Sequence, residues 1–267
     1  MKKPIGIFDS GVGGLTVYKA IREAFPEEDL IYFGDTARVP YGPKSPNTII
    51  EYSVQNSRFL LQQGIKILIV ACNTSSSVAL PHLRQLTSIP IIGVIEPGAD
   101  MAIRCTRNQR IGVIGTEGTI RSGAYDKAIQ ALLPTAHVSN RACPLFVPLV
   151  EEGWLQGEIA RDIVAEYLSF YQGQNIDTLV LGCTHYPLLK DLIQSVVGPQ
   201  VTLVDSAEAI TEHLRAQLSP EYDGKYGSDR FYVSDNEAKF EQIAVRILGR
   251  ELDQLRRVRL FESWFES

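Results

Sequence analysis

The stretch IKILIVACNTSSS, residues 65–77, places an apolar run directly before a cysteine, an asparagine and four hydroxyl residues. A short apolar run of this kind is typical of a strand buried on both faces of a parallel sheet. The stretch DTLVLGCTHYPLL, residues 177–189, repeats the order of apolar run, cysteine and hydroxyl residue. We therefore predict two buried strands that each end at a cysteine, Cys72 and Cys183.

Apolar runs alternate with helical patterns around the first of these stretches. Strand-like runs lie at residues 5–8, 30–35 and 90–97, and helix candidates lie at 15–25, 48–64 and 78–86. A rhythm of strand, helical crossover and strand predicts a parallel sheet covered by helices. The fold class is therefore predicted to be α/β.

The rhythm begins again in the second half of the chain. IGVIGTEGT (111–119) resembles IGIFDSGVGG (5–14) in its apolar start and its glycine-rich exit, and these starts lie 106 residues apart (111 − 5). The two cysteines are separated by a similar offset of 111 residues (183 − 72). Two features that recur at nearly the same spacing predict two similar α/β lobes.

The trailing segment, with a strand candidate at 230–235 and a helix candidate at 238–249, has no equivalent in the second unit. We expect it to return to the first lobe. The predicted domains are therefore a discontinuous first lobe, residues 1–97 plus 207–267, and a second lobe, residues 98–206. The charged residues after Arg250 are expected to form an amphipathic tail.

Composition excludes several classes of protein. The chain has 267 residues, of which 45% are hydrophobic and 21% charged, and a net charge of −5. A negative chain lacks the basic surface that phosphate binding needs, so nucleic acid is not expected as the main partner. The N-terminus reaches Asp9 too soon for a signal peptide, and no apolar run approaches the roughly 20 residues that span a bilayer. We expect a cytoplasmic protein without membrane contact.

Four cysteines occur without a C-x-x-C pair, which favours reduced thiols over disulfides. The tightest metal-ligand pair would be Cys183 with His185, so no metal site is predicted. Cys105 and Cys143 do not end apolar strands before a hydroxyl residue and are interpreted as structural. Each remaining thiol either packs in the core or carries out chemistry.

The glycine-rich turn at residues 9–14, DSGVGG, suggests a dinucleotide site but does not match one. From Gly11 the pattern is G-x-G-x-x-T, which lacks the third glycine of the fingerprint. Asp9 would also place a carboxylate where a pyrophosphate binds. A tight turn is the simpler interpretation of this motif.

The position of Cys72 and Cys183 favours chemistry over packing. Taken alone, a free cysteine is most often a small buried hydrophobe. Ligands of open parallel sheets, however, bind beyond the carboxyl ends of the strands, where both thiols are predicted to lie. A helix start also favours anions and can lower a cysteine pKa well below its ordinary value of about 8.5.

Two thiols that face each other from two lobes suit a reaction that inverts a stereocentre. One thiolate removes a proton from one face while the opposite thiol returns a proton to the other. Asp9 is placed to assist Cys72, and His185 to assist Cys183. The alternative, a redox-active pair, would need the two sulfurs in contact. No lysine sits at a strand end in a pattern that suggests pyridoxal phosphate, so a cofactor-free reaction is expected.

Six motifs in this order resemble glutamate racemase, a member of the aspartate/glutamate racemase superfamily. They are IFDSGVGGLTV, YFGDTARVPYG, ACNTSSSVAL, IGTEGTIRSGAY, PLFVPLVEEG and LGCTHYPLL. The resemblance extends over about 200 residues, through VDSAEAI near residue 210. It implies two lobes with pseudo-twofold symmetry, an active-site cleft between them, and a cofactor-independent isomerase that interconverts L- and D-glutamate for peptidoglycan synthesis.

The resemblance also implies site residues and partners. Cys72 and Cys183 would be the two acid/base residues, with Asp9, His185 and Glu151 as further catalytic groups. The substrate, glutamate, would be bound by Asp9, Ser10, Pro40, Tyr41, Gly42, Asn73, Thr74, Thr116, Thr119, Thr184 and His185. A homodimer is implied, with no metal and no cofactor. The absence of the long N-terminal extension of activator-dependent members implies activity without a cell-wall precursor.

Two alternatives stay open at this point. The chain could racemise aspartate or another amino acid, because related enzymes share the paired cysteines. It could instead be a carboxylate- or nucleotide-binding regulator that keeps the fold without turnover. Both thiols being present argues against the regulator, since binding alone has no need of the second.

Overall fold

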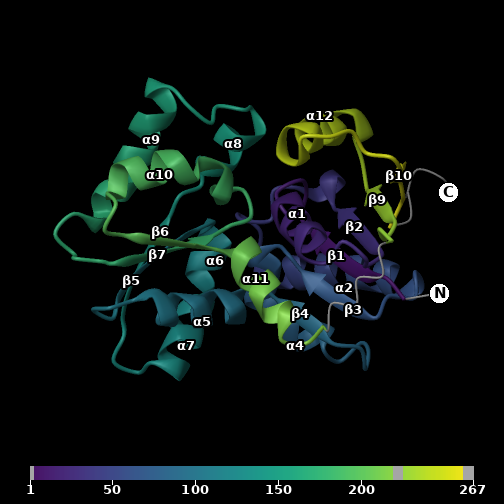
Figure 1. Cartoon of the computed structure of the whole chain (residues 1–267), viewed down its shortest axis with the longest axis horizontal. Coiled ribbons are helices and arrows are strands. Elements are labelled where there is room, and N and C mark those ends of the chain that lie inside the picture. Colours follow the sequence, from purple (N-terminus) through teal and green to yellow (C-terminus); the bar gives the residue numbers. More distant parts are fainter. Residues whose placement is uncertain (1–2, 219–224, 261–267) are drawn as a thin grey trace.

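The computed structural model describes residues 3–218 and 225–260, which form two parallel-sheet α/β lobes side by side (Figure 1). The first sheet has the order β10-β9-β2-β1-β3-β4 and the second β6-β5-β7-β8. Every pairing within them is parallel. The first sheet contains β1 (Ile5–Asp9), β2 (Leu30–Gly34), β3 (Ile67–Val70), β4 (Ile91–Gly93), β9 (Asp229–Val233) and β10 (Leu255–Arg257). The second contains β5 (Arg110–Gly115), β6 (His137–Ala142), β7 (Thr178–Gly182) and β8 (Thr202–Asp205).

Helices cover both faces of each sheet, as the apolar strands require. Those connecting strands of the first sheet are α1 (Leu15–Ala24), η1 (Thr36–Arg38), α2 (Pro46–Gln62), α3 (Asn73–Val78), α4 (Leu80–Leu83) and α12 (Glu237–Leu248). The remainder are α5 (Ile95–Cys105), α6 (Glu117–Ser122), α7 (Ala124–Leu132), α8 (Phe146–Glu151), α9 (Glu158–Leu168), η2 (Ser169–Tyr171), η3 (Tyr186–Leu189), α10 (Lys190–Val197) and α11 (Ser206–Arg215). The α/β prediction is confirmed.

The central strands carry the core because they are buried along their whole length. Every residue of β1, β2, β3 and β7 is buried, which explains their nearly continuous apolar sequence. In the first lobe, one sheet face packs against α1, α11 and α12 and the other against α2 and α4. In the second, α8, α9 and α10 cover one face and α5 and α7 the other. Each lobe is therefore a three-layer unit.

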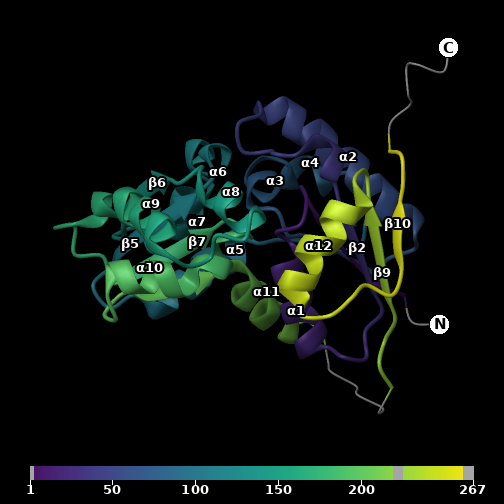
Figure 2. The same cartoon turned by 90° about the horizontal axis from the view of Figure 1, so that it is seen from above.

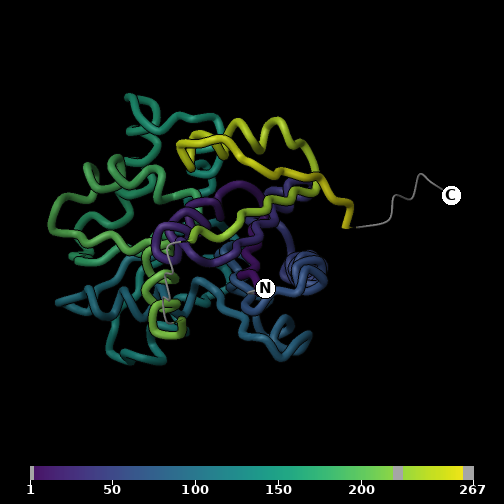
Figure 3. The backbone as a smooth tube through the Cα atoms, turned by 45° about the vertical axis from the view of Figure 1, so that its right-hand side comes forward, coloured from purple at the N-terminus to yellow at the C-terminus, as the bar shows by residue number. Residues whose placement is uncertain are grey.

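The C-terminal segment joins the first sheet. Strand β9 pairs in parallel with β2, and β10 pairs with β9. Seen from above, β9, β10 and α12 lie with the first lobe and away from the second sheet (Figure 2). The backbone trace shows this segment, in green to yellow, running beside the purple N-terminal segment (Figure 3).

The proposed domain boundaries remain predictions. Two segments, residues 90–97 and the residues after Arg250, have a secondary structure that differs from the one expected from the sequence. The run at 90–97 is a strand only over Ile91–Gly93, because α5 begins at Ile95. Ile95 packs in the second lobe's core, so the boundary drawn after residue 97 falls inside this helix. The tail expected after Arg250 contains β10, and its residues 261–267 lie outside the described residues.

Helix α11 connects the two lobes. Ile210 and Leu214 pack into the core of the first lobe, while Ala209 packs with the second. In the described part of the chain, no helix is long and apolar enough to cross a bilayer. The residues that meet between the sheets follow the carboxyl ends of four strands. These strands are β1 and β3 in the first lobe and β5 and β7 in the second.

Candidate active site

A small cavity of about 40 Å³ lies between the lobes, with both Cys72 and Cys183 in its wall. Cys72 follows β3 of the first lobe and Cys183 follows β7 of the second. The other lining residues are Ser10, Val39, Pro40, Tyr41, Gly42, Asn73, Thr74, Thr116, Val147, Glu151, Thr184 and His185. The two strand ends that suggested the fold therefore open into one shared space.

Cys72 is the N-terminal cap of helix α3. Its sulfur accepts a hydrogen bond from the backbone N–H of Ser75 at 3.5 Å, and its thiol donates to Oγ of Ser10 at 3.7 Å. The Cys72 side chain is buried among Tyr41 and Ile49. This geometry matches the predicted helix start. The thiol pKa, however, is not lowered as a helix start alone would lower it.

The helix start does not lower the pKa of the Cys72 thiol. Burial, with a further contribution from the Asp9 carboxyl, raises the pKa of this thiol to about 11. The hydrogen bonds from Ser75 and Ser10 act in the opposite direction but are outweighed. A single short helix start cannot compensate for removing a thiolate from water beside another acidic group. Cys72 is therefore a protonated thiol near neutral pH.

Cys183 has a different environment, because a chain of three groups extends from its sulfur. The sulfur lies 3.9 Å from Nδ1 of His185, and Nε2 of His185 lies 3.3 Å from Oε1 of Glu151. The second contact is at ion-pair distance without the alignment of a hydrogen bond. Glu151 comes from the end of α8, so the chain joins two segments of the second lobe.

These contacts hold a positive charge beside Cys183. Burial lowers the pKa of His185, but its contacts with Cys183 and Glu151 outweigh burial and raise it to about 10. His185 in turn lowers the pKa of Glu151, and the Lys239 ammonium acts in the same direction. At neutral pH the imidazole is therefore protonated and Glu151 is ionised, so a positive charge lies beside the Cys183 sulfur.

Asp9 is fully buried at the end of β1, where it influences Cys72 of the first lobe and contacts groups that follow Cys183 in the second. Its carboxylate accepts hydrogen bonds from the N–H of Gly11 at 2.9 Å and from the Thr184 hydroxyl at 3.4 Å. Burial raises the pKa of Asp9, while His185 and three backbone N–H groups oppose the rise. Asp9 therefore contacts Thr184 of the second lobe as well as influencing Cys72, the partner expected from the sequence.

The glycine-rich turn contacts the second lobe rather than a nucleotide. A Cβ atom at Gly13 would overlap the side chains of His185 and Thr184. The hydroxyl of Thr16, at the start of α1, also donates to the carbonyl oxygen of Thr184 at 3.0 Å. Glycine at position 13 is therefore needed for the close approach of the two lobes.

A threonine cluster, Thr74, Thr116 and Thr119, closes the contact between α3 and α6. The hydroxyls of Thr74 and Thr116 lie 2.8 Å apart, and that of Thr119 lies within 3.0 Å of Thr116 and 3.3 Å of Thr74. Thr116 also caps α6 by accepting from the Thr119 N–H. Of the cluster, Thr74 and Thr116 line the cavity, and Thr119 stands behind them.

Asn73 joins both lobes through its amide. Its Nδ2 donates to the hydroxyl of Ser206 at 3.1 Å, and its Oδ1 accepts from the hydroxyl of Tyr125 at 2.8 Å. Tyr125 belongs to α7 and Ser206 begins α11. The amide is thus fixed by hydrogen bonds before any ligand is present.

The loop that follows β2 forms another wall of the cavity. The hydroxyl of Tyr41 donates to Asp35 and accepts from Nδ2 of Asn56 at 3.1 Å. This hydroxyl therefore points into the first lobe, which leaves the backbone of Tyr41 and Gly42 toward the cavity. A Cβ atom at Gly42 would come within 3.0 Å of the Thr116 side chain, so this loop also packs tightly against the second lobe.

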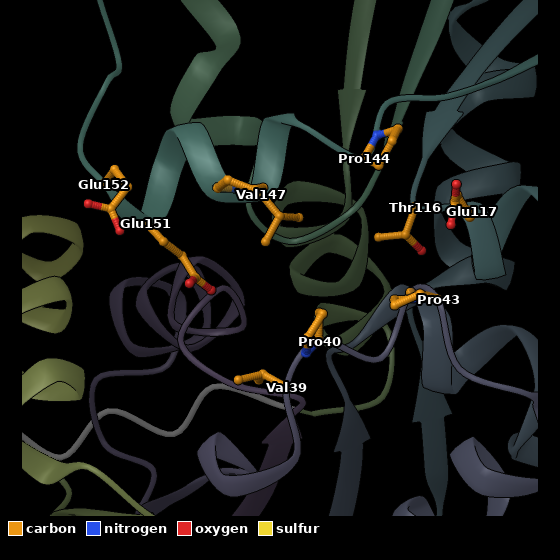
Figure 4. A pocket seen from close by; sticks show the side chains of 11 residues that line it. Val39, Pro40, Pro43, Thr116, Glu117, Pro144, Val147, Glu151 and Glu152 are labelled. Carbon is orange, nitrogen blue, oxygen red and sulfur yellow. The ribbon is translucent and has the colours of Figure 1, made fainter.

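A wider pocket of about 380 Å³ adjoins the inner cavity and shares six of its residues, Val39, Pro40, Gly42, Thr116, Val147 and Glu151. Figure 4 shows Val39 and Pro40 on one side and Val147, from α8, on the other. The Glu151 carboxylate points into the space between them (Figure 4). The lining of this wider pocket is mainly apolar apart from Thr116, Glu117, Glu151 and Glu152.

The match to a family model covers residues 5–214, under the description Asp/Glu/Hydantoin racemase. The chain belongs to this racemase family. It is 54% identical to the glutamate racemase of Geobacter metallireducens over 262 residues, which covers 97% of each chain.

Solved racemase structures match the fold over nearly the whole chain. The glutamate racemase isoform RacE1 of Bacillus anthracis has a TM-score of 0.93 at 40% identity, covering 97% of this chain and 98% of that one. The glutamate racemase of Francisella tularensis, solved in complex with D-glutamate, has a TM-score of 0.90 at 39% identity, with the same coverage. The predicted resemblance to glutamate racemase is confirmed.

Four residues of this racemase site were missing from the sequence prediction. Tyr125 and Ser206 were missed because they act through Asn73 and not at a strand end. Val39 and Val147 line the cavity from the motifs VPYG and PLFVPLV, but an apolar side chain carries no chemical signal. Their positions inside two of the motifs were the only available clue.

The other two cysteines of this racemase lie away from the cavity. Cys143 is fully buried in the second lobe's core, and burial raises its pKa to about 12. Cys105 packs at the end of α5. All four cysteines are free, and in the described residues no cluster of three or more His, Cys, Asp or Glu side chains is arranged to hold a metal ion.

Proposed function

We propose that this protein interconverts L- and D-glutamate by moving a proton between the substrate's Cα atom and two cysteines. The observation that carries the proposal is the single cavity that Cys72 and Cys183 line from opposite lobes. The names of its relatives supply the substrate. No cofactor enters this reaction, because the two thiols supply both the base and the acid.

The proton balance of the reaction is simple. The thiolate of one cysteine takes the Cα proton, and the electron pair left on Cα spreads into the adjacent carboxylate. The thiol of the other cysteine then delivers its proton to the opposite face of Cα. The two sulfurs exchange protonation states in each turnover, so the reverse reaction uses the same groups in the opposite roles.

The charges of the site suggest how the resting enzyme is protonated. His185, protonated and held by Glu151, places a positive charge beside the Cys183 sulfur. Cys72, beside Asp9 and with a raised pKa, favours the thiol. We infer that Cys72 holds a transferable proton in the resting enzyme.

The polar wall provides groups for the two substrate carboxylates and the ammonium. We assign the hydroxyls of Ser10, Thr74, Thr116 and Thr184 and the Asn73 amide, all of which line the cavity, as donors to the carboxylates. The hydroxyl oxygens can also accept hydrogen bonds from the ammonium. Thr119 supports Thr74 and Thr116 from behind. Pro40, Tyr41 and Gly42 would contact the substrate through their backbone, since the Tyr41 hydroxyl is bonded elsewhere.

The wider biological role follows from the product. D-glutamate would be supplied for peptidoglycan synthesis, and a cytoplasmic location and a homodimer are proposed with it. Sedimentation at several protein concentrations would test the dimer. Nothing in the proposed chemistry requires a second copy, because the cavity is lined from both lobes of one chain.

Hydrogen exchange at Cα tests the function directly. Purified protein in heavy water, with no added cofactor, is expected to incorporate deuterium at Cα of either glutamate enantiomer while forming the other. The same assay with L- and D-aspartate measures substrate choice. A higher kcat/KM for aspartate would replace the glutamate assignment, and tight glutamate binding without any exchange would favour the non-catalytic regulator.

A pH dependence follows from the His185–Glu151 contact. Glu151 is among the groups that raise the pKa of His185, so Glu151→Gln is expected to lower it. His185 then loses its proton at lower pH. The alkaline limb of the kcat/KM profile should therefore shift to lower pH by about one unit or more. Glu152→Gln is the matched control, because it removes a neighbouring carboxylate while Glu151 keeps its contact with His185. An unmoved limb in Glu151→Gln would contradict the assigned role of this pair.

A further inference from the structure

Three consecutive serines follow the catalytic motif, and each has a different environment. The Ser76 hydroxyl donates to the carbonyl of Val70 and accepts from the N–H of Val94, which joins α3 to the sheet. The Ser77 hydroxyl donates to the carbonyl of Thr74 within its own helix. Ser75 is the member of the three whose hydroxyl has no hydrogen-bond partner in the described chain.

Ser75 is also the serine that faces the Cys72 sulfur. It is fully buried, and its backbone N–H donates to that sulfur at 3.5 Å. Its side chain is near enough to favour the charged form of the Cys72 thiol, although it is not aligned as a hydrogen bond in this state. A buried hydroxyl without a partner costs free energy, so its presence calls for a state in which it is paired.

The groups around Cys72 show why its thiolate would need such a donor. Two titratable groups of the first lobe face it, Asp9 on β1 and the Tyr32 phenol on β2, and both are neutral or negative. The imidazolium of His185 instead contacts Cys183, across the cavity. Among the groups that influence Cys72, the favourable ones are Ser10, the Ser75 N–H and the Ser75 side chain.

We propose that Ser75 is a positioning residue whose hydroxyl donates a hydrogen bond to Cys72 when this cysteine becomes a thiolate. Its role in turnover rests on the proposed racemase function. In that reaction the Cys72 thiol gives its proton to Cα, and the new negative charge on sulfur rotates the Ser75 O–H toward it. The hydroxyl keeps its own proton throughout. When Cys72 next removes a proton from Cα, the thiol re-forms and the hydrogen bond is released.

The test measures the thiolate of Cys72 without any substrate. Alkylation by iodoacetamide is followed over a pH series, and mass spectrometry of the digested full-length protein reads Cys72 and Cys183 separately. In Ser75→Ala, the Cys72 alkylation curve is expected to move to higher pH, with about tenfold less thiolate at a fixed pH. The Cys183 curve is expected to stay in place, because no contact of Ser75 reaches that sulfur in the described structure.

Stability separates this role from a structural one. Removing an unpaired buried hydroxyl should leave the melting temperature unchanged or raised, whereas kcat/KM should fall by about tenfold. Ser77→Ala is the matched control, since it removes a hydroxyl of the same helix that donates to the Thr74 carbonyl and not to the sulfur. Ser75→Thr keeps a hydroxyl and is expected to keep the parental Cys72 curve.

Three results would overturn the proposal. One is an unchanged Cys72 curve in Ser75→Ala, and another is a lowered melting temperature with both cysteine curves displaced. The third is a Ser75→Thr curve displaced as far as that of alanine, which would assign the effect to side-chain volume. Alkylation needs no turnover, so it tests Ser75 independently of the racemase function. A displaced Cys72 curve in Ser75→Ala without any deuterium exchange by the parent protein would reject the racemase function and keep the role of Ser75.

Discussion

Cys72→Ser and Cys183→Ser are each expected to lower racemisation by roughly 10²- to 10⁴-fold, the range typical of removing a general acid or base. A serine hydroxyl is far too weak an acid to replace a thiol on either face of Cα. Because the two enantiomers have equal free energy in water, kcat/KM must fall equally in both directions. Polarimetry or a chiral separation of the products measures the loss.

A substrate analogue separates the two faces. In a glutamate analogue with a leaving group at Cβ, removal of the Cα proton expels that group and forms a Cα=Cβ double bond. This elimination needs one thiolate and no proton return, so each variant should retain it with the enantiomer that presents its proton to the remaining cysteine. Loss of elimination with both enantiomers in either variant would mean that the cysteines do not act on separate faces.

The other cysteines supply the controls for this pair. Cys105→Ala removes a thiol at the end of α5 and should leave the rate near that of the parent protein. Cys143→Ala removes a fully buried side chain from the second lobe's core, so it should lower the melting temperature more than the rate. Racemisation near the parental rate in Cys72→Ser or Cys183→Ser would disprove the two-base mechanism.

His185→Asn is expected to have the next largest effect, a fall in kcat/KM of roughly 10²-fold. The imidazolium lies 3.9 Å from the Cys183 sulfur. At that distance an effective dielectric constant of about 20 gives ~4 kcal/mol between unit charges, close to a thousandfold. Water that enters the space left by the ring recovers part of this energy, which reduces the expected loss.

The pH profile distinguishes an electrostatic role of His185 from simple packing. The pKa of His185 is raised to about 10, so its charge is present at neutral pH and is lost as the pH rises through that value. The alkaline limb due to this group should therefore disappear in His185→Asn. His82→Asn, at an exposed position of helix α4, is the control and should change neither rate nor profile. An unchanged alkaline limb in His185→Asn would argue that another group titrates there.

Much of the fold could be predicted because buried parallel strands have a distinctive sequence. β1, β2, β3 and β7 are apolar over most of their length, and the predicted runs cover all of these strands except Asp9 at the end of β1. β6 was missed because it is an edge strand with mostly half-buried, polar residues. β10 was missed because three residues, two of them exposed arginines, give no periodic signal.

The catalytic motifs could be predicted for a similar reason. Cys72 and Cys183 each interrupt an apolar pattern at a strand end, where ordinary packing does not require a thiol. The partners of Asn73 could not be found in this way, since Tyr125 lies 52 positions away and Ser206 lies 133 positions away. Nothing local to either residue marks it as part of the site.

The sequence by itself determined the two α/β units, the pair of cysteines and the family, because each of these depends on local pattern. The tertiary structure decided the electrostatic surroundings of each cysteine. A helix start favours a thiolate at Cys72, but burial beside Asp9 reverses that preference, whereas Cys183 lies beside the ion pair of His185 and Glu151. Desolvation and charge–charge contacts depend on residues brought together from both lobes, so no stretch of sequence could have shown this asymmetry.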